Sequence, residues 1–590
     1  MKIKDMKKIF FIAAAASLTL GVTSCGEDFL TEEPSSKLPL DGYYNSESRI
    51  LESAVAAYDP MHWFDYFGGW APLNLVWDSM GDDVYVGGGN TGDQGQIHKI
   101  SQYRSDPNDN IGGAWTTAYS GINRSIRLID NATALESMDD AKRQMFIDEG
   151  RTLRAWYYLV LWKTWGNVPF YMDNLTFPYI AEQISADELY ANIIVDLEDV
   201  LAGNGLPMKR PDAEAGRMTW AAAAMIYADY VMYQKDQTRY GKALDYMKKI
   251  ITSKEYELVA GADYDQLFDY EHEWSKEIIL DINFKSKGGA RDWGNANAPG
   301  GTVLPAMIGI DGLTYYGGED KQVDFEGGWG FLAISKEVYD AFEENDLRRD
   351  ISLLNIETYM EDMMKNNNTL VTYGGRYQNT GVFLRKYLGR PGGKEGVVAS
   401  GDLNWENNLH LYRYAETLLN AAELALATGD NGAQGYFNQV RDRAGLPQKT
   451  VSVDNILAER RVEFVGEGKR YFDLVRSGKA ASVLTKGSGK LPEKTRKLVW
   501  LKDEDYAKGK NTDYKEYILV PKSDLKMLSE EDFKDGEKPR NLYWTCAATV
   551  WSAPGKAVPE REAWNEKKKY IQIPQSEIEA AKGTITQNEY

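Results

Sequence analysis

Apolar residues recur at helical spacing over long stretches of this chain, and this pattern limits its fold more than any other feature. Residues 114–135 carry an apolar stripe from Trp115 to Ile129, as one face of an amphipathic helix does. A second helix is predicted from Asp139 to about residue 165, where a Gly-Asn-Val-Pro sequence stops it. The same reasoning predicts further helices over 185–201, 219–234, 240–252, 411–428, 434–444, 455–467 and 471–477.

The predicted helices come as neighbouring pairs with short connections. A helix with one apolar face must pack against others to bury it, and stacked pairs achieve this along an array. The strict tetratricopeptide (TPR) consensus is absent, but the predicted succession of helix pairs resembles a TPR array. We therefore predict a mainly α fold, in which TPR-like helix pairs form the scaffold and long irregular loops with a few short strands carry the ligand face.

Three segments lack helical periodicity: residues 60–112, 284–330 and 485–568. The first two are rich in Gly, Trp, Tyr and Asp. Long irregular segments inside a compact chain are uncommon unless they serve binding or catalysis. The sequence therefore directs the search for a ligand site to 60–112 and 284–330.

The charge and the cysteine content exclude several classes of function. Asp and Glu total 88 against 68 Lys and Arg, so the formal net charge is -20. Nucleic-acid binding needs a basic face that displaces counterions, and binding to an anionic membrane surface needs a basic patch. The chain has only two cysteines, Cys25 and Cys546, and four scattered histidines. We expect no nucleic-acid partner and no metal site.

Motifs for cofactors and catalysis are incomplete. A G-x-G-x-x-G pattern at 87–92 has the spacing of a dinucleotide fingerprint, but no strand and helix are predicted around it. The pair His272-Glu273 lacks the second histidine of a zincin, and neither a Walker A motif nor a G-x-S-x-G elbow occurs. We expect no cofactor and no enzymatic activity.

The first residues have the features of a lipoprotein leader. Lysines precede an apolar run, Ile9–Val22, that is too short to span a bilayer with ease. The run ends in Val-Thr-Ser before Cys25, which resembles a bacterial lipobox. We predict that residues 1–24 are removed and that Cys25 carries the lipid. Its acyl chains would bury methylene groups worth about 0.8 kcal/mol each.

A series of motifs, in order along the chain, resembles the SusD/RagB family. The series opens with C-G-E-D-F-L at 25–30 and closes with T-Q-N-x-Y at 586–590. Between them lie R-T-L-R-A-W-Y-Y at 151–158, W-G-N-V-P at 165–169, G-R-M-T at 216–219, R-Y-A-E-x-L-L-x-A-A-E at 413–423, N-Q-V-R-x-R-A-G-L at 438–446, E-R-R-x-E-F at 459–464, G-x-R-Y-F-D-L-x-R at 468–476 and I-P-x-S-E-I at 573–578. The resemblance covers essentially residues 25–590.

This resemblance implies a fold, a location and a partner. It implies a removed signal peptide (1–24), an N-terminal part with TPR-like helices (25–280) and a C-terminal part (281–590), the last two packed as one globular unit. It implies a lipoprotein on the outside of the outer membrane, held to the membrane by its lipid anchor alone. The implied partner is a SusC-like TonB-dependent transporter, over which the lipoprotein sits as a lid. Family members usually bind oligosaccharides, some bind peptides, and catalysis is not implied.

The arginines and glutamates of the C-terminal motifs could be mistaken for an active site. Arg413, Glu416 and Glu423 fall on one predicted helical stripe, and they could be faced by Arg460, Arg461 and Glu463. Buried pairs of this kind set the register of packed helices, and the resemblance places them in the scaffold whatever the ligand. We predict a structural ion-pair network.

Aromatic and polar residues of the irregular segments are the candidates for ligand binding. A sugar has an apolar C–H face, which a flat ring can cover, and a rim of hydroxyls, which need donors and acceptors. The candidates are Trp70, Trp77, Asp82, Asp83, Tyr103 and Arg104 in the first segment, and Trp293, Asn295, Tyr315, Tyr316 and Trp329 in the second.

Three functions are compatible with the sequence. The leading hypothesis is a surface lipoprotein that captures oligosaccharides and delivers them to the transporter. The second is peptide capture with the same architecture, which would favour apolar slots and exposed main-chain partners over open aromatic surfaces. The third is a glycoside hydrolase, which would need two carboxylates about 5 Å or about 6.5–9.5 Å apart across a cleft.

Overall fold

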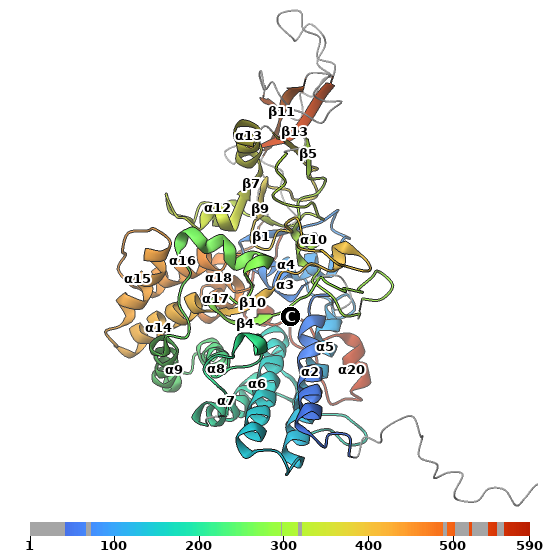
Figure 1. The fold of residues 1–590 in the computed structure, drawn as a ribbon, viewed down its shortest axis with the longest axis vertical. Helices are drawn as coiled ribbons and strands as arrows, with labels where there is room; N and C mark the ends of the chain where they lie inside the picture. The colour runs from blue at the N-terminus through green and yellow to red at the C-terminus, as the bar shows by residue number, and fades with distance from the viewer. Residues whose placement is uncertain are drawn as a thin grey trace, which may run out of the picture.

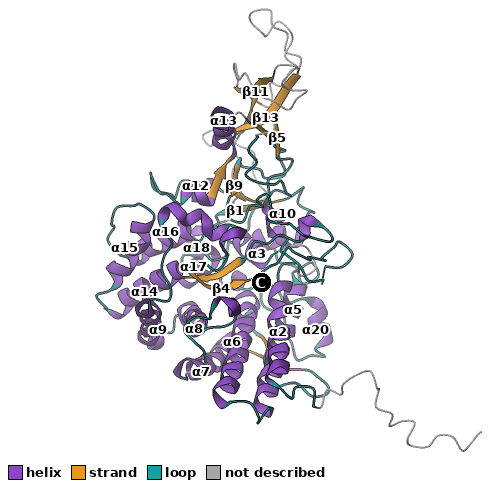
Figure 2. Ribbon diagram, in the orientation of Figure 1, coloured by secondary structure: helices purple, strands orange, loops and turns teal. Residues whose placement is uncertain are grey.

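The computed structural model describes residues 42–66, 72–203, 205–296, 298–316, 321–367, 369–487, 493–501, 519–521, 541–550 and 560–590. The long helices fill the lower and middle parts of the molecule (Figure 1). Most strands lie above them, as Figure 2 shows in orange against the purple helices. The mainly α architecture predicted from the sequence is confirmed.

The helices of the scaffold form one continuous array. In chain order they are α2 (Glu47–Trp63), α5 (Gly112–Ala134), α6 (Asp140–Trp165), α7 (Ala186–Ala202), α8 (Trp220–Gln234), α9 (Tyr240–Ser253), α14 (Tyr414–Thr428), α15 (Ala433–Arg443), α16 (Val453–Glu463) and α17 (Arg470–Arg476). Helix α5 packs between α2 and α6, α7 packs on α6 and α8, and α9 packs on α8 and α14. Residues 254–413 separate the two parts of the array in the sequence. In the structure the two parts adjoin, because α9 packs directly on α14.

The helix ends follow from local sequence signals. Asp139 precedes α6 and accepts the amides of Ala141 and Lys142, both at 3.1 Å, which satisfies donors that the first turn leaves free. Helix α6 ends at Gly166, whose φ of 74° suits glycine. In α8, the run of small residues 221–224 is fully buried, so neighbouring backbones approach closely there.

Two sequence predictions about local structure were wrong. The helix expected from residue 411 begins at Tyr414, because 409–413 form a strand, β10 (Leu409–Arg413), that pairs with β4 (Ile278–Ile282) and sets His410 opposite Asp281. The segment 60–112 contains regular elements, α3 (Leu73–Ser79), β1 (Val84–Gly87) and α4 (Gly95–Ser101).

The glycine pattern at 87–92 therefore does lie between a strand and a helix. Strand β1, however, pairs antiparallel with β6 (Phe331–Ile334). A dinucleotide fingerprint belongs to a parallel βαβ unit, in which the helix N-terminus faces the pyrophosphate. The pattern is a turn between β1 and α4, and it gives no reason to expect a nucleotide.

The remaining strands are short. The largest sheet has the order β1-β6-β9-β7, with β9 (Val382–Leu384) and β7 (Leu353–Asn355). Other pairs are β2 (Val168–Pro169) with β3 (Gln183–Ile184), β5 (Thr314–Tyr316) with β8 (Leu370–Thr372), and β11 (Glu493–Leu501) with β12 (Leu519–Pro521) and β13 (Asn541–Val550). Further helices are α10 (Leu304–Ile308), α11 (Lys336–Tyr339), α12 (Arg349–Ser352), α13 (Ile356–Asn367), α18 (Ala480–Val483) and α20 (Gln575–Ala580). Most of 485–568 lies outside the described residues.

A buried ion network ties the helical array to β4 and β10. Arg413, at the end of β10, is 1% exposed, and its guanidinium contacts three carboxylates. The N–O distances are 2.6 Å to Glu277, 2.9 Å to Glu463 and 2.8 Å to Glu467. Arg443 also contacts Glu463, at 2.6 Å. The network holds segments from three distant parts of the sequence in one arrangement.

The ion-pair network predicted from the sequence is present, but some partners differ. Arg460 contacts Glu416 at 3.0 Å, as expected. Glu423 is paired with Arg476 of α17, and Arg461 contacts Asp82 and Asp83.

Glu467 should make the stability of this network depend on pH. Burial acts to raise its pKa, but Arg413 and Lys386 outweigh burial and lower it to about 2. A folded pKa below the ordinary value means that the ionised carboxylate stabilises the fold at neutral pH and that this stabilisation is lost as the pH falls toward 2. We expect the stability difference between the wild type and Glu467→Gln to shrink from about pH 5 to about pH 3. Denaturant titrations of both proteins at each pH measure it, and a difference that stays constant would contradict the prediction.

Candidate functional site

A tight turn presents Trp293 to solvent. Asp292 and Asn295 exchange backbone hydrogen bonds of 2.9 and 3.3 Å, and the Asp292 carboxylate accepts the amide of Trp293 at 2.8 Å. The Trp293 side chain is 56% exposed. Because the backbone beneath the ring is already fixed, little conformational freedom remains to be lost when a ligand covers it.

Trp329 is held in a glycine-rich segment. Its amide donates to the Ala306 carbonyl at 2.7 Å, and the amide of Gly328 donates to the Ile310 carbonyl at 3.0 Å. A Cβ at position 328 would lie 2.3 Å from the Ala306 oxygen, so only glycine allows this approach. The Trp329 ring packs partly against the hydrophobic core, which fixes its position.

The two indole rings lie side by side. Their centroids are 5.7 Å apart and their planes meet at 38°. We call Trp293 and Trp329 the tryptophan pair. One ring is anchored on the core and the other is open to solvent, so the pair forms a rigid, tilted aromatic surface that a flat apolar ligand face can cover.

Arg376 and Asp311 form a polar edge beside the tryptophan pair. Arg376 lies against the backbone of Gly330, the residue after Trp329, where a Cβ would be 3.3 Å from the Arg376 Cβ. The Arg376 Nε is 2.9 Å from Asp311 Oδ1, and both side chains are about one-third exposed (33% and 30%). A guanidinium donates and a carboxylate accepts, so this pair can hydrogen-bond to ligand hydroxyls. The sequence reasoning missed both residues, because neither stands out by composition or motif.

The glycine-rich loop after β1 contacts the segments that carry Trp329 and Arg376. The amide of Gly88 donates to the Gly330 carbonyl at 3.1 Å, and the amide of Tyr377 donates to the Gly88 carbonyl at 3.1 Å. Asp93 closes the loop by accepting the amide of Gly89 at 2.7 Å. The loop is therefore tied to the segment that carries Trp329.

Asp82 and Asp83 face the scaffold. The Asp82 carboxylate accepts from Arg470 at 2.7 Å and from Arg461 at 3.0 Å, and Asp83 accepts from Arg461 at 2.7 Å. Burial acts to raise the pKa of Asp82, but the two arginines hold it below its ordinary value. Burial raises the pKa of Asp83. These contacts explain the two aspartates as anchors of α16 and α17, and we do not place them in the ligand site.

The other candidates of the first segment contact residues outside the tryptophan pair. Tyr103 is 2% exposed and donates its hydroxyl to the Met80 carbonyl at 2.6 Å, so its ring has no free face. Trp77 is half-buried and packs edge-on against Phe472, with centroids 5.0 Å apart. Arg104 is near the surface, 3.4 Å from Glu562. Trp70 and the lipid-attachment candidate Cys25 lie outside the described residues.

In the second segment the structure separates exposed from buried candidates. Tyr315 is buried, its hydroxyl lies 3.1 Å from that of Tyr359, and burial raises its pKa to about 12. Tyr316 belongs to β5 and stands opposite Leu370 in the ladder. Asn295 is exposed at the turn that carries Trp293. The structure thus brings Trp293, Asn295 and Trp329 into one region.

No metal centre is evident in the part of the chain that the structure describes: there, no group of three or more His, Cys, Asp or Glu side chains is placed to hold an ion.

Comparison with known proteins identifies the family. The model of the SusD family matches residues 276–590, more than half of the chain. The chain belongs to the SusD family. This agrees with the resemblance read from the motifs and with the helical scaffold.

Similar proteins of the SusD family cover from 58% to 92% of this chain. Surface glycan-binding protein A from Bacteroides thetaiotaomicron, solved in complex with laminarihexaose, is 36% identical with a TM-score of 0.74, over 92% of this chain and 100% of that one. A structure described as a laminarin binding SusD-like protein is 28% identical with a TM-score of 0.67, over 75% of this chain and 93% of that one. The starch-binding protein SusD of Bacteroides thetaiotaomicron is 27% identical, over 58% of this chain and 66% of that protein.

Proposed function

We propose that this protein captures oligosaccharides and that the tryptophan pair holds them. The observation that carries the proposal is the exposed Trp293 ring fixed 5.7 Å from Trp329, with Arg376 and Asp311 beside them. The rings can cover the C–H faces of sugar units while the charged pair exchanges hydrogen bonds with hydroxyls. The names of two relatives, which mention laminarihexaose and laminarin, support the choice of a glycan.

This arrangement favours a glycan over the two alternatives. A bound peptide would be served by apolar slots and free main-chain partners, whereas the tryptophan pair is an open surface with a charged edge. A hydrolase would need free carboxylates, but Asp311 is tied to Arg376 and Asp292 holds the amide of Trp293. We propose binding without catalysis.

A screen of immobilised glycans tests the proposed function. The purified chain should bind at least one neutral oligosaccharide, and laminarihexaose is the first to try. An open, wet site exchanges water hydrogen bonds for protein ones at a small net gain. We therefore expect a Kd between about 1 μM and about 1 mM, which corresponds to roughly -8 to -4 kcal/mol. Binding to peptides together with no binding to any glycan would contradict the proposal.

We further propose that the protein works at the outside of the outer membrane and passes its ligand to a SusC-like TonB-dependent transporter. Family membership supports this location and this partner. Weak capture suffices in such a system, because a lid tethered over a transporter raises the effective concentration of ligand at its mouth. A weakly held ligand can also leave for the transporter.

Lipid attachment at Cys25 is the predicted means of anchoring. Within the described residues, none of the helices has the length and apolar content needed to cross a bilayer. Cys25→Ala should move the protein from the membrane fraction to the soluble fraction or leave its leader uncleaved, because the acyl chains supply the membrane affinity. Labelling cells with a tagged fatty acid checks this directly, with Cys546→Ala as the matched control. Equal labelling of Cys25→Ala and wild type would disprove the assignment.

A further inference from the structure

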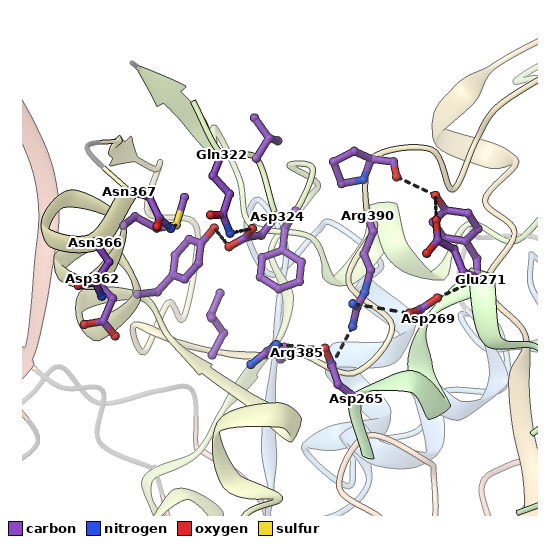
Figure 3. A pocket seen from close by; sticks show the side chains of 17 residues that line it. Asp265, Asp269, Glu271, Gln322, Asp324, Asp362, Asn366, Asn367, Arg385 and Arg390 are labelled. Atoms are coloured by element: carbon purple, nitrogen blue, oxygen red, sulfur yellow. Dashed lines mark hydrogen bonds and ion pairs between the residues drawn. The ribbon is translucent and has the colours of Figure 1, made fainter. Parts of the chain in front are cut away.

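A cavity of about 630 Å³ opens at a place that the tryptophan pair does not line. It lies between the 3₁₀ helices η4 (Gly261–Phe268) and η5 (Tyr270–His272) on one side and α13 on the other (Figure 3). Neither Trp293 nor Trp329 lines it. Its volume falls within the range of roughly 300–1,000 Å³ that is usual for small-molecule sites.

One wall of the cavity carries two arginines that share a carboxylate. Arg390 donates to Asp265 Oδ1 at 2.8 Å, and Arg385 donates to Asp265 Oδ2 at 3.2 Å. Both arginine side chains keep exposed surface, 22% for Arg390 and 25% for Arg385. Arg385 also donates to the Asp350 carbonyl. Each guanidinium has five N–H donors, more than these contacts use, so donors remain for a ligand.

The opposite wall carries amides and a carboxylate from α13. Figure 3 shows these side chains on the α13 side of the cavity, away from the two arginines: Asp362, Asn366 and Asn367. The rings of Tyr359, also from α13, and Phe325 line the cavity too, with centroids 5.9 Å apart. Tyr359 is fixed because its hydroxyl donates to Asp324 at 2.9 Å.

The charges of the cavity favour a neutral ligand with many hydroxyls. The lining has more carboxylates than guanidiniums, so an anion would be repelled. The carboxylates are also mostly engaged: Asp265 by the arginines, Asp324 by Tyr359, and Asp269 by His272 at 2.9 Å. This leaves few free oxygens to surround a metal cation. Hydroxyls both donate and accept, and therefore suit a mixed wall of carboxylates, amides and guanidiniums.

We propose that this cavity is a second saccharide site, which takes a short neutral oligosaccharide or one end of a longer glycan. The inference rests on the proposed function in one respect, that the ligand is a glycan. Phe325 of the cavity and Trp329 of the tryptophan pair lie four residues apart in one segment. A glycan held at both places would bind more tightly than at either alone, because the second contact becomes intramolecular.

The test measures binding to the cavity in the absence of the tryptophan pair. The purified Trp293→Ala/Trp329→Ala protein is titrated with a panel of neutral oligosaccharides that includes laminarihexaose, and with an oligogalacturonate as an anionic probe. We expect weak residual binding of at least one neutral member and none of the anion. Adding Arg390→Gln to this protein should weaken the residual binding about tenfold or more, because it removes a charge-assisted hydrogen bond. Arg349→Gln, at a partly exposed arginine that does not line the cavity, is the matched control.

The outcomes separate this inference from the proposed function. Wild-type binding that disappears entirely in the Trp293→Ala/Trp329→Ala protein would overturn the second site alone. Failure of the wild type to bind any member of the panel would overturn both proposals. Residual binding that Arg390→Gln and Arg349→Gln leave equally intact would show that the residual site lies outside this cavity.

Discussion

Replacing Arg413 with alanine should lower the free energy of unfolding by about 3–5 kcal/mol, because it removes the cation that three buried carboxylates share and leaves their charge only partly balanced. Arg413 is the cation that Glu277, Glu463 and Glu467 share, at distances from 2.6 to 2.9 Å. The three glutamates are at most 1% exposed, so water cannot replace the lost contacts. Denaturant unfolding, followed by circular dichroism, measures the loss.

A surface arginine provides the control for this prediction. Arg49 pairs with Glu52 at 2.8 Å but keeps 37% of its side chain exposed, and Arg49→Ala should change stability little. Glycan affinity of the Arg413→Ala protein, measured at a temperature where it stays folded, should match the wild type. If Arg413→Ala left stability unchanged and abolished glycan binding, the network would belong to the ligand site and our structural interpretation would be wrong.

The helical scaffold could be predicted from the sequence because its signals are local. An amphipathic stripe, a capping residue and a stop sequence lie within one segment, and α6 follows all three from Asp139 to Gly166. The pairing of α9 with α14 has no such signal, since the interaction joins segments far apart in the chain.

Short elements could not be predicted from the sequence, because they contain too few residues to show a periodicity. Strand β10 has five residues and runs directly into α14 with no intervening turn, so its apolar residues looked like an extension of the helical stripe. Periodicity cannot separate a short strand from a helix end. Helices α3 and α4 have seven residues each, too few to reveal a pattern within a glycine-rich segment.

The candidate site was only partly predictable. Tyr103, Tyr315 and Trp293 come from similar Gly- and Tyr-rich sequence, yet the first two are buried and the third is exposed. Burial depends on packing with distant segments, which composition does not encode. Asp82 likewise meets Arg461 and Arg470, almost 400 residues later in the chain. Such contacts become visible only in the fold.

Removal of the tryptophan pair should reduce glycan affinity more than any other change at the surface. Trp293→Ala and Trp329→Ala are each expected to weaken binding about tenfold or more, since a loss of 1.4 kcal/mol is one factor of ten. Large aromatic side chains commonly dominate binding energy. The thermal midpoint of Trp293→Ala should stay at the wild-type value, because its ring is 56% exposed. Trp329 packs partly on the core, and its replacement should lower the midpoint modestly.

Calorimetric titration with the glycan that the screen identifies tests the central claim most directly. The proteins compared are the wild type, Trp293→Ala, Trp293→Phe and Phe177→Ala. Phe177 is 85% exposed in the loop between β2 and β3 and controls for loss of a surface ring. Our account predicts a rise in Kd of about tenfold or more for Trp293→Ala, a smaller rise for Trp293→Phe and no change for Phe177→Ala. A Trp293→Ala protein that binds as tightly as the wild type would contradict the account and place the glycan elsewhere.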